Sequence, residues 1–459
     1  MFDDSNPQRP NILFIMNDQH RFDYLGCMGA DFVNTPNIDR IARNGVVFRN
    51  CFSNSPVCAP ARIGLAAGMQ PSRLGSLDNH SYLPLSQRTY YQRLRDAGYY
   101  VGCVGKLDLA KPDPYNGIRG DRPINYAWGF THPVECEGKM HAGRGRPGAP
   151  LGPYNAWLEE KGLLQEFHED YMVRQGNWAG DCRDSVLPTE AWEDCYIGTR
   201  AAEWIDDIPT DFPWHLFVSF VGPHDPFDPP TEYADKYRNA DVPEPILDEM
   251  EGKPEWIRSR DKEFDQGTVR RTRQQYCAEI ECLDDQVGKI LDSLERKGQL
   301  DNTVIIFSSD HGEMLGDHGL YTKSVMYEAS MHVPLAVSAP GMKGGRQSNA
   351  IVELIDINPT ICELAGLEPQ NDIDARSFGP VVRGEQDAHR DDAVSALRNC
   401  RCLRTERYKL IDNYQQGLEL YDLQEDPQEL HNISGDRQDL TRDLCRRMVG
   451  RFVEGRWMR

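Results

Sequence analysis

Two kinds of apolar pattern alternate along this chain. Continuous apolar runs of strand length lie at residues 11–16, 99–104, 214–221 and 303–307. Such runs are typical of strands that are buried on both faces. From Tyr276 to Leu294 the apolar residues instead recur every three or four positions, and Gly298 follows, which predicts a helix ending at this glycine. The alternation predicts an α/β fold with one large mixed, mainly parallel sheet flanked by helices.

The pattern changes in two other parts of the chain. Residues 111–190 are rich in glycine, proline and aromatic residues with weak periodicity, which indicates an insertion of loops and short helices near the site. Beyond residue 385 the runs become short and are separated by charged residues. Strands are predicted at 396–403, 408–411 and 419–423, and a helix at 439–452. We therefore expect a large α/β domain over residues 1–384 and a C-terminal α+β subdomain, a small antiparallel sheet plus helix, over residues 385–459.

Polar residues follow directly where the four predicted central strands end. Asp18 follows the first, Lys106 and Asp108 the second, His224 the third, and Asp310 and His311 the fourth. The carboxyl ends of parallel strands share one edge of a sheet, and open α/β folds bind ligands there. We therefore expect these carboxylates, imidazoles and the lysine to meet in one crevice.

Three of these residues have the chemistry of a metal site. Asp18, Asp310 and His311 would offer oxygen ligands and one imidazole, which suit Ca²⁺, Mg²⁺ or Mn²⁺. The set lacks the sulfur and histidine content of a typical zinc site. A polar turn after a strand is the competing interpretation of Asp310 and His311. Lys323 follows this segment and offers positive charge for an anionic substrate.

Residues 58–62 read Cys-Ala-Pro-Ala-Arg. Pro60 suits the first turn of a helix, which places Cys58 at or just before the helix N-terminus, where backbone N–H groups favour an anion. Arg62 lies four residues on and can face the same side as Cys58. A nucleophile at a positive helix end beside an arginine suits a charged, oxygen-rich substrate.

Composition restricts the partners and the compartment. The chain holds 72 acidic against 51 basic residues, a net charge of −21, which argues against nucleic acid and anionic membranes as partners. Residues 1–7 lack the pattern of a signal peptide. The 13 cysteines include no Cys-x-x-Cys pair, which indicates reduced thiols and a cytoplasmic location. The sequence leaves open whether the protein is a homo-oligomer.

The pentapeptide at Cys58 resembles the sulfatase signature Cys-x-Pro-x-Arg, whose cysteine is oxidised after translation to formylglycine. The segments 55–62, 69–73 and 78–79 are together similar to the choline sulfatase and phosphonate monoester hydrolase branch. Further family patterns match at 35–45, 105–106, 223–224, 310–312 and 419–427. The chain is identified as a member of the formylglycine-dependent sulfatase family, within the alkaline phosphatase superfamily. The resemblance implies an alkaline phosphatase-like fold.

The resemblance also implies roles for individual residues. One divalent cation, with Ca²⁺ expected and Mn²⁺ or Mg²⁺ as alternatives, would be bound by Asp18, Asp310, His311 and the formylglycine made from Cys58. The hydrate of formylglycine would attack sulfur with one hydroxyl and release sulfate when the other loses its proton. The remaining roles would be positioning of the hydrate by Arg62, binding of sulfonyl oxygens by Lys106 and Lys323, protonation of the leaving alcohol by His224, and a hydrogen bond to the substrate from Asn79.

Two positions depart from the common family pattern. The paired aspartates after the first strand are here Asp18-Gln19, where Gln19 would either ligate weakly or only donate and accept hydrogen bonds. The usual Gly-Lys-x-His is here Gly-Lys-Leu-Asp, so Asp108 stands where the histidine thought to release sulfate would lie. The base for this step therefore stays open between Asp108 and His224.

These features predict a sulfuric ester hydrolase of the arylsulfatase-like kind. Its substrate would be a sulfate monoester of a small molecule or a saccharide, and it would depend on a maturation enzyme that makes formylglycine. The alternative is a phosphonate monoester or phosphodiester hydrolase that uses the same residues on another tetrahedral anion. A non-catalytic binding protein is a third hypothesis, which the complete set of site residues disfavours.

Overall fold

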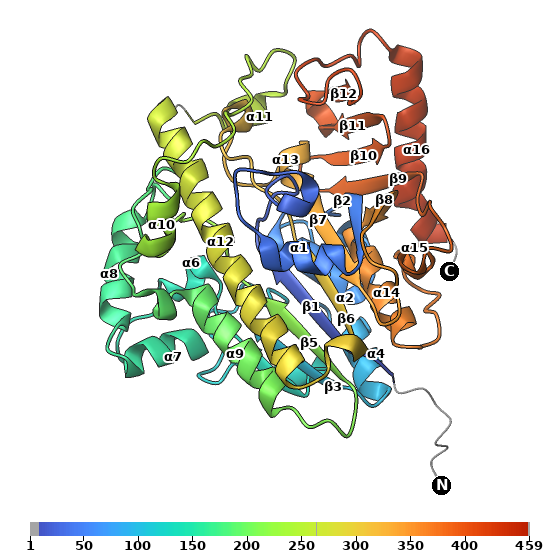
Figure 1. The fold of residues 1–459 in the computed structure, drawn as a ribbon. Helices are drawn as coiled ribbons and strands as arrows, with labels where there is room; N and C mark the ends of the chain where they lie inside the picture. The colour runs from blue at the N-terminus through green and yellow to red at the C-terminus, as the bar shows by residue number, and fades with distance from the viewer. Residues whose placement is uncertain (1–8, 263, 458–459) are drawn as a thin grey trace.

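An eight-stranded sheet forms the centre of the molecule (Figure 1) in the computed structural model, which describes residues 9–262 and 264–457. Its strands are β1 (Asn11–Asn17), β2 (Val46–Phe52), β3 (Tyr100–Gly105), β4 (His132–Glu135), β5 (Trp214–Ser219), β6 (Thr303–Ser309), β7 (His332–Ser338) and β8 (Arg346–Glu353). The strand order is β4-β3-β5-β1-β6-β7-β2-β8. Strand β7 runs antiparallel to both neighbours, and the other neighbouring pairs are parallel. The predicted mixed, mainly parallel sheet is therefore confirmed.

Helices cover both faces of this sheet because its central strands are apolar on both sides. Leu13 and Ile15 of β1 pack into one core cluster, whereas Ile12, Phe14 and Met16 pack into a second cluster on the opposite face. The first face is covered by α1 (Pro36–Arg43), α9 (Glu193–Asp207) and α12 (Gln266–Arg296), and the second by α2 (Cys58–Ala67), α4 (Tyr90–Asp96) and α14 (Ile357–Leu364). None of the helices in the described part of the chain is long and apolar enough to cross a membrane.

The predicted central elements agree with the observed ones to within a few residues at most ends. The runs at 11–16, 99–104, 214–221 and 303–307 correspond to β1, β3, β5 and β6. Helix α12 begins ten residues before the predicted start at Tyr276, where the Asp265 side chain accepts a hydrogen bond from the backbone N–H of Thr268. Strands β2, β7 and β8 were not predicted. The predicted absence of a signal peptide over residues 1–7 falls outside the described residues.

A second, four-stranded antiparallel sheet lies at the C-terminal end of the chain (Figure 1). Its strands are β9 (Asp392–Ala396), β10 (Arg401–Thr405), β11 (Tyr408–Asp412) and β12 (Leu418–Asp422), and α16 (Gln438–Trp457) follows. Leu444 and Met448 of α16 pack on Leu403, Leu410 and Leu420 of the sheet. The prediction of one strand over 396–403 is wrong, because the backbone turns at Leu397, whose N–H donates to the carbonyl of Cys400. The domain boundary at residues 384/385 stays a prediction.

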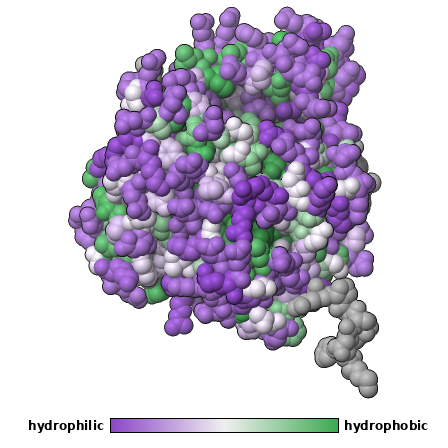
Figure 2. All heavy atoms as spheres, viewed as in Figure 1, coloured by the Kyte–Doolittle hydropathy of each residue, from purple (hydrophilic) through white to green (hydrophobic). Residues whose placement is uncertain are grey.

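The segment 111–190 contains a strand that the sequence pattern did not predict. Strand β4 lies within it and pairs in parallel with β3 at the edge of the main sheet. The segment also holds short helices: α5 (Pro123–Ala127), α6 (Lys139–Ala142), α7 (Pro153–Glu160) and α8 (Leu164–Arg174). The smaller helices elsewhere are α3 (Pro71–Leu74), α10 (Thr231–Tyr237), α11 (Glu255–Arg258), α13 (Glu328–Met331) and α15 (Gly379–Arg383). Figure 2 shows that hydrophilic side chains dominate the face viewed in Figure 1, in keeping with the high content of charged residues.

A glycine at the end of β3 permits a close contact between two strands. Gly105 has a φ of 107°, and a Cβ atom placed on it would lie 1.9 Å from the carbonyl oxygen of Ser219 on β5. The next backbone N–H, that of Lys106, donates to the same carbonyl at 3.0 Å. Only glycine therefore allows β3 to deliver Lys106 at this point.

We expect Gly105→Ala to destabilise the protein more than a glycine substitution that meets only backbone strain. Gly98 is the matched control, since its φ is 92° and nothing lies within 4 Å of a Cβ atom placed on it. Gly98→Ala should cost about 1–3 kcal/mol, and Gly105→Ala more, because the added methyl group collides with a strand backbone. Urea denaturation measures both, and equal midpoints would contradict this account.

Candidate active site

The ends of the central strands bring the predicted polar residues together. Asp18 follows β1, and Asp310 and His311 follow β6, the neighbouring strand in the sheet. One ligand atom from each of Asp18, Cys58, Asp310 and His311 lies within 4.8 Å of the others. All four side chains are buried. Residues separated by nearly three hundred positions thus form one compact cluster, as the strand pattern predicts.

Cys58 is the first residue of α2 and points into this cluster. Its Sγ atom lies 3.2 Å from Nε2 of His311 and 3.7 Å from Oδ1 of Asp18. The other ring nitrogen of His311, Nδ1, lies 3.0 Å from the carbonyl oxygen of Gly312, which favours a proton on Nδ1 and a free lone pair on Nε2. Two carboxylates and an unprotonated imidazole nitrogen form a donor set that fits a hard divalent cation.

Buried cations balance the two carboxylates of the cluster. Nε of Arg62 lies 2.7 Å from Oδ2 of Asp310, and Nη2 of Arg62 lies 3.6 Å from Oδ2 of Asp18. Nζ of Lys106 contacts the same Asp18 oxygen. Arg62 also donates through Nη1 to the carbonyl of Lys106 at 3.0 Å and to Oγ of Ser219 at 2.6 Å. Its Nη2 is buried without a hydrogen-bond partner among the described residues, which leaves a donor directed at the cluster.

The cations also change the ionisation of the central groups. Burial by itself would raise the pKa of the Cys58 thiol, but Lys106, Lys111 and Lys323 outweigh burial and hold this pKa well below its usual value. Burial and the Cys58 charge oppose ionisation of Asp18, yet Lys106, with His224 and Arg62, lowers the pKa of this carboxyl below its usual range. The site therefore favours negative charge on a protein side chain or a ligand at this point.

Gln19 takes part in a hydrogen-bond network beside the cluster. Its Nε2 donates to Oδ1 of Asp225 at 3.1 Å and to Glu313, and its Oε1 accepts from Nζ of Lys323. Lys323 in turn contacts Nε2 of His224, whose Nδ1 lies 3.3 Å from Oδ1 of Asp225. The Gln19 side chain thus makes hydrogen bonds and orients Lys323, and its weak ligation of a cation stays a prediction.

Sequence reasoning missed Asp225 and Glu313, although both are buried in this network. Asp225 follows His224 directly, and Glu313 lies two residues after His311. Their adjacency to predicted site residues was the available signal. Adjacency alone could not show which of the neighbouring carboxylates would point into the site.

Asp108 lies beside the cluster, and its carboxylate is held by two lysines. Its Oδ2 is 3.0 Å from Nζ of Lys106 and also contacts Lys111. Burial opposes ionisation, but the two lysines lower the pKa of Asp108 below its usual value. Asp108 therefore carries a stable negative charge, and it is the second carboxylate, besides Asp18, that contacts Nζ of Lys106.

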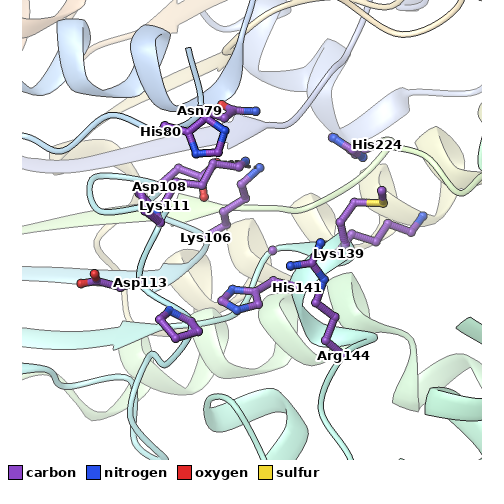
Figure 3. A pocket seen from close by; sticks show the side chains of 14 residues that line it. Asn79, His80, Lys106, Asp108, Lys111, Asp113, Lys139, His141, Arg144 and His224 are labelled. Carbon is purple, nitrogen blue, oxygen red and sulfur yellow. Dashed lines mark hydrogen bonds and ion pairs between the residues drawn. The ribbon is translucent and has the colours of Figure 1, made fainter. Parts of the chain in front are cut away.

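A cavity of about 360 Å³ opens onto these residues (Figure 3). Its inner wall includes Asn79, Lys106, Asp108 and His224, and its outer wall comes from residues 111–144 of the predicted insertion. Oδ1 of Asn79 accepts a hydrogen bond from the backbone N–H of Ala59 at 3.1 Å. The Asn79 carbonyl thus binds the first turn of α2, and its amide NH₂ group is available to a ligand, as its expected role requires.

Comparison with known protein families identifies the class of this chain. Residues 10–367 match the sulfatase family model, and residues 316–454 match the model described as N-sulphoglucosamine sulphohydrolase, C-terminal. The first match covers well over half of the sequence. The chain therefore belongs to the sulfatase family, within the alkaline phosphatase superfamily, as its motifs predicted.

Individual relatives agree with this assignment over most of their length. The chain is 29% identical to an arylsulfatase of Clostridium perfringens, with 98% of this chain and 95% of the relative covered. It is 31% identical to a choline-sulfatase of Rhizobium meliloti, with 93% and 82% covered. The crystal structure of the phosphonate monoester hydrolase of Agrobacterium radiobacter superposes with a TM-score of 0.81 at 24% identity, covering 97% and 96% of the two chains. This last likeness shows the fold, and the sulfatase relatives support the predicted sulfuric ester hydrolase.

The donor set predicts which carboxylate substitution removes the metal. Asp310→Asn should weaken binding of the cation by more than about a hundredfold, the upper range for residues that only orient ligands. Asp108→Asn is the matched control, because Asp108 lies outside the group of four donors. Elemental analysis of the purified proteins measures the content and identifies Ca²⁺, Mn²⁺ or Mg²⁺. Equal metal content in both variants would contradict the assignment.

Proposed function

We propose that the protein hydrolyses sulfate monoesters at the cavity beside Cys58, after Cys58 has been converted to formylglycine. One observation carries this proposal. Cys58 begins α2 with its sulfur 3.2 Å from Nε2 of His311, inside a buried group of oxygen and nitrogen donors. Lys106 and Lys323 approach the same point from two other segments. A nucleophile, a cation site and two ammonium groups around one position suit attack on an anionic tetrahedral centre.

The proposed reaction needs formylglycine and a divalent cation, and each has a separate function. Formylglycine would supply the attacking hydroxyl as its hydrate, and a divalent cation, which we propose to be Ca²⁺, would make that hydroxyl more acidic. Asp18, Asp310 and His311 would hold the cation. Formylglycine requires a maturation enzyme that recognises the segment around Cys58.

Three basic side chains would bind the sulfuryl group and the attacking hydroxyl. Each lysine ammonium has three donors, and the described contacts of Lys106 and Lys323 leave donors for a ligand. The unpartnered Nη2 of Arg62 would orient the attacking hydroxyl. Because these groups are buried, their attraction to the developing negative charge is stronger than it would be in water. The amide of Asn79 would add a neutral hydrogen bond to the substrate.

Protons would enter and leave through His224 and one base. Nε2 of His224 borders the cavity beside Lys323, so this imidazole would protonate the leaving alcohol, with Lys323 as its neighbouring donor. Either Asp108 or His224 would take the proton whose loss releases sulfate. The two lysines that pair with Asp108 weaken its basicity, whereas its place after Lys106 favours it as the residue in the position of the family histidine.

The substrate class and the location are further parts of this proposal. The match of residues 316–454 to an N-sulphoglucosamine sulphohydrolase model supports a saccharide sulfate, and the arylsulfatase relative supports activity on aryl sulfates. The thirteen cysteines are all free thiols, which supports a cytoplasmic enzyme. Phosphonate monoester hydrolysis at the same site is the competing outcome.

Cys58→Ala should abolish hydrolysis of 4-nitrophenyl sulfate. The expected loss is about a thousandfold or more, because the nucleophile is removed. The fold should persist, since a small side chain is exchanged for a smaller one, and circular dichroism checks this. Cys51→Ala is the matched control, as Cys51 is equally buried on β2. The proposal would be overturned if Cys58→Ala retained turnover. It would also be overturned if the matured enzyme without substitutions hydrolysed phenyl phosphonate esters faster than 4-nitrophenyl sulfate.

The choice of base makes a separate kinetic prediction. If Asp108 takes the proton that releases sulfate, Asp108→Asn should slow turnover by about a hundredfold and produce a burst of leaving group. His224→Ala should instead slow the first step, most strongly for substrates with poor leaving groups. Stopped-flow measurement on aryl sulfates of graded leaving-group pKa separates the two. Unchanged turnover and no burst in Asp108→Asn would leave His224 as the base.

A further inference from the structure

The outer wall of the cavity carries basic side chains for which the proposed reaction has no use. Lys111, Lys139, His141 and Arg144 line it, in the same cavity as Lys106 and His224 (Figure 3). They gather in one cavity of a chain whose net charge is −21. A basic pocket in an acidic protein concentrates anions locally against the overall field.

Most of these charges are already neutralised by neighbours, and one is not. Lys111 pairs with Asp108, and Lys139 lies 2.8 Å from Asp228 and 2.7 Å from Glu279. The guanidinium of Arg144 makes no hydrogen bond or ion pair with any residue in the described part of the chain. Figure 3 shows this guanidinium turned toward the cavity beside His141. Arg144 thus presents an uncompensated positive charge to whatever fills the outer cavity.

The remaining wall residues fit an anion better than a cation. Asp113, the other carboxylate of the wall, is paired with Arg122 at 3.1 Å and accepts a hydrogen bond from the Tyr82 hydroxyl at 3.2 Å. Burial and the Arg144 charge lower the pKa of His141, so its imidazole is a neutral hydrogen-bonding group at neutral pH. The described lining residues include no Phe, Tyr or Trp, whereas quaternary ammonium ligands are recognised by aromatic faces.

We infer that the substrate carries a second anionic group, a carboxylate or a second sulfate, which Arg144 binds with His141 at the outer end of the cavity. This inference rests on the proposed function, in which the first sulfate lies at Lys106 and Lys323. A guanidinium can donate two parallel hydrogen bonds to either kind of anion. The cavity is accordingly specific for anionic sulfated saccharides over neutral or cationic sulfate esters.

Binding to the inactive Cys58→Ala variant tests the inference without turnover. Calorimetry compares N-acetylglucosamine 6-O-sulfate with glucosamine 2-N,6-O-disulfate, which differ in the acetyl or sulfo group on one nitrogen. A second pair, a hexose 2-sulfate and the corresponding uronic acid 2-sulfate, tests a carboxylate. In at least one pair, the dianionic ligand should bind about tenfold to a hundredfold more tightly than the monoanionic ligand. This is the gain in affinity expected from one charge-assisted hydrogen bond.

Two arginine variants then locate the second anion. Adding Arg144→Gln to Cys58→Ala should abolish the preference for the dianionic ligand. Arg146→Gln, in the same exposed segment but outside the cavity lining, should retain it. Equal binding within both ligand pairs, or an undiminished preference in Arg144→Gln, would overturn the inference. A clear binding preference with no sulfate release by the matured enzyme would instead refute the proposed function alone.

Discussion

The pairing of Arg62 with two buried carboxylates is the interaction on which the site depends. Asp18 and Asp310 are fully buried, and an ionised carboxylate without a counter-charge is costly in such a place. Arg62 contacts Asp310 at 2.7 Å and lies near Asp18, while Lys106 contacts the same Asp18 oxygen that Arg62 approaches. Removing one member would leave the others as uncompensated charges. The cluster is therefore held as a unit, with its donor atoms already close together before a cation binds.

The same helix that supplies Arg62 also supplies the nucleophile position. Cys58 and Arg62 lie one turn apart on α2, so a shift of the helix would move both relative to the carboxylates. The carboxylates in turn are fixed by β1 and β6, which pair in parallel up to Asn17 and Ser309. The order of strands in the sheet thus determines which distant residues meet, and the position of α2 determines where Cys58 lies relative to the carboxylates. Gln19 adds a link from this cluster to Lys323 and His224.

The sequence was sufficient to predict those site residues whose position follows from the ends of strands or the start of a helix. Asp18, Lys106, His224 and Asp310 follow buried strands, and parallel pairing alone brings such residues to one edge. Cys58 was predicted at a helix start because proline spacing marks that start. The single strand expected over 396–403 was wrong, since the chain turns between Leu397 and Cys400 and the turn contains no glycine or proline to mark it in the sequence.

Other features depend on side-chain direction and could not be read from the sequence. The contacts of Gln19 with Asp225 and Glu313 join three segments, and each has other polar residues beside it. Asp108, which pairs with Lys111, has a positive φ, a conformation that a non-glycine residue seldom adopts. Strand β4 is short and lies in a segment with weak periodicity, so its pattern resembles a loop.

The most direct test of the central claim relates activity to the chemical state of residue 58. Samples prepared with and without a formylglycine-generating enzyme would differ in the fraction of Cys58 converted, which peptide mass spectrometry measures. We predict that turnover of a sulfate ester rises in proportion to this fraction and vanishes when it is zero. Full turnover by protein that carries only the thiol at Cys58 would contradict the account.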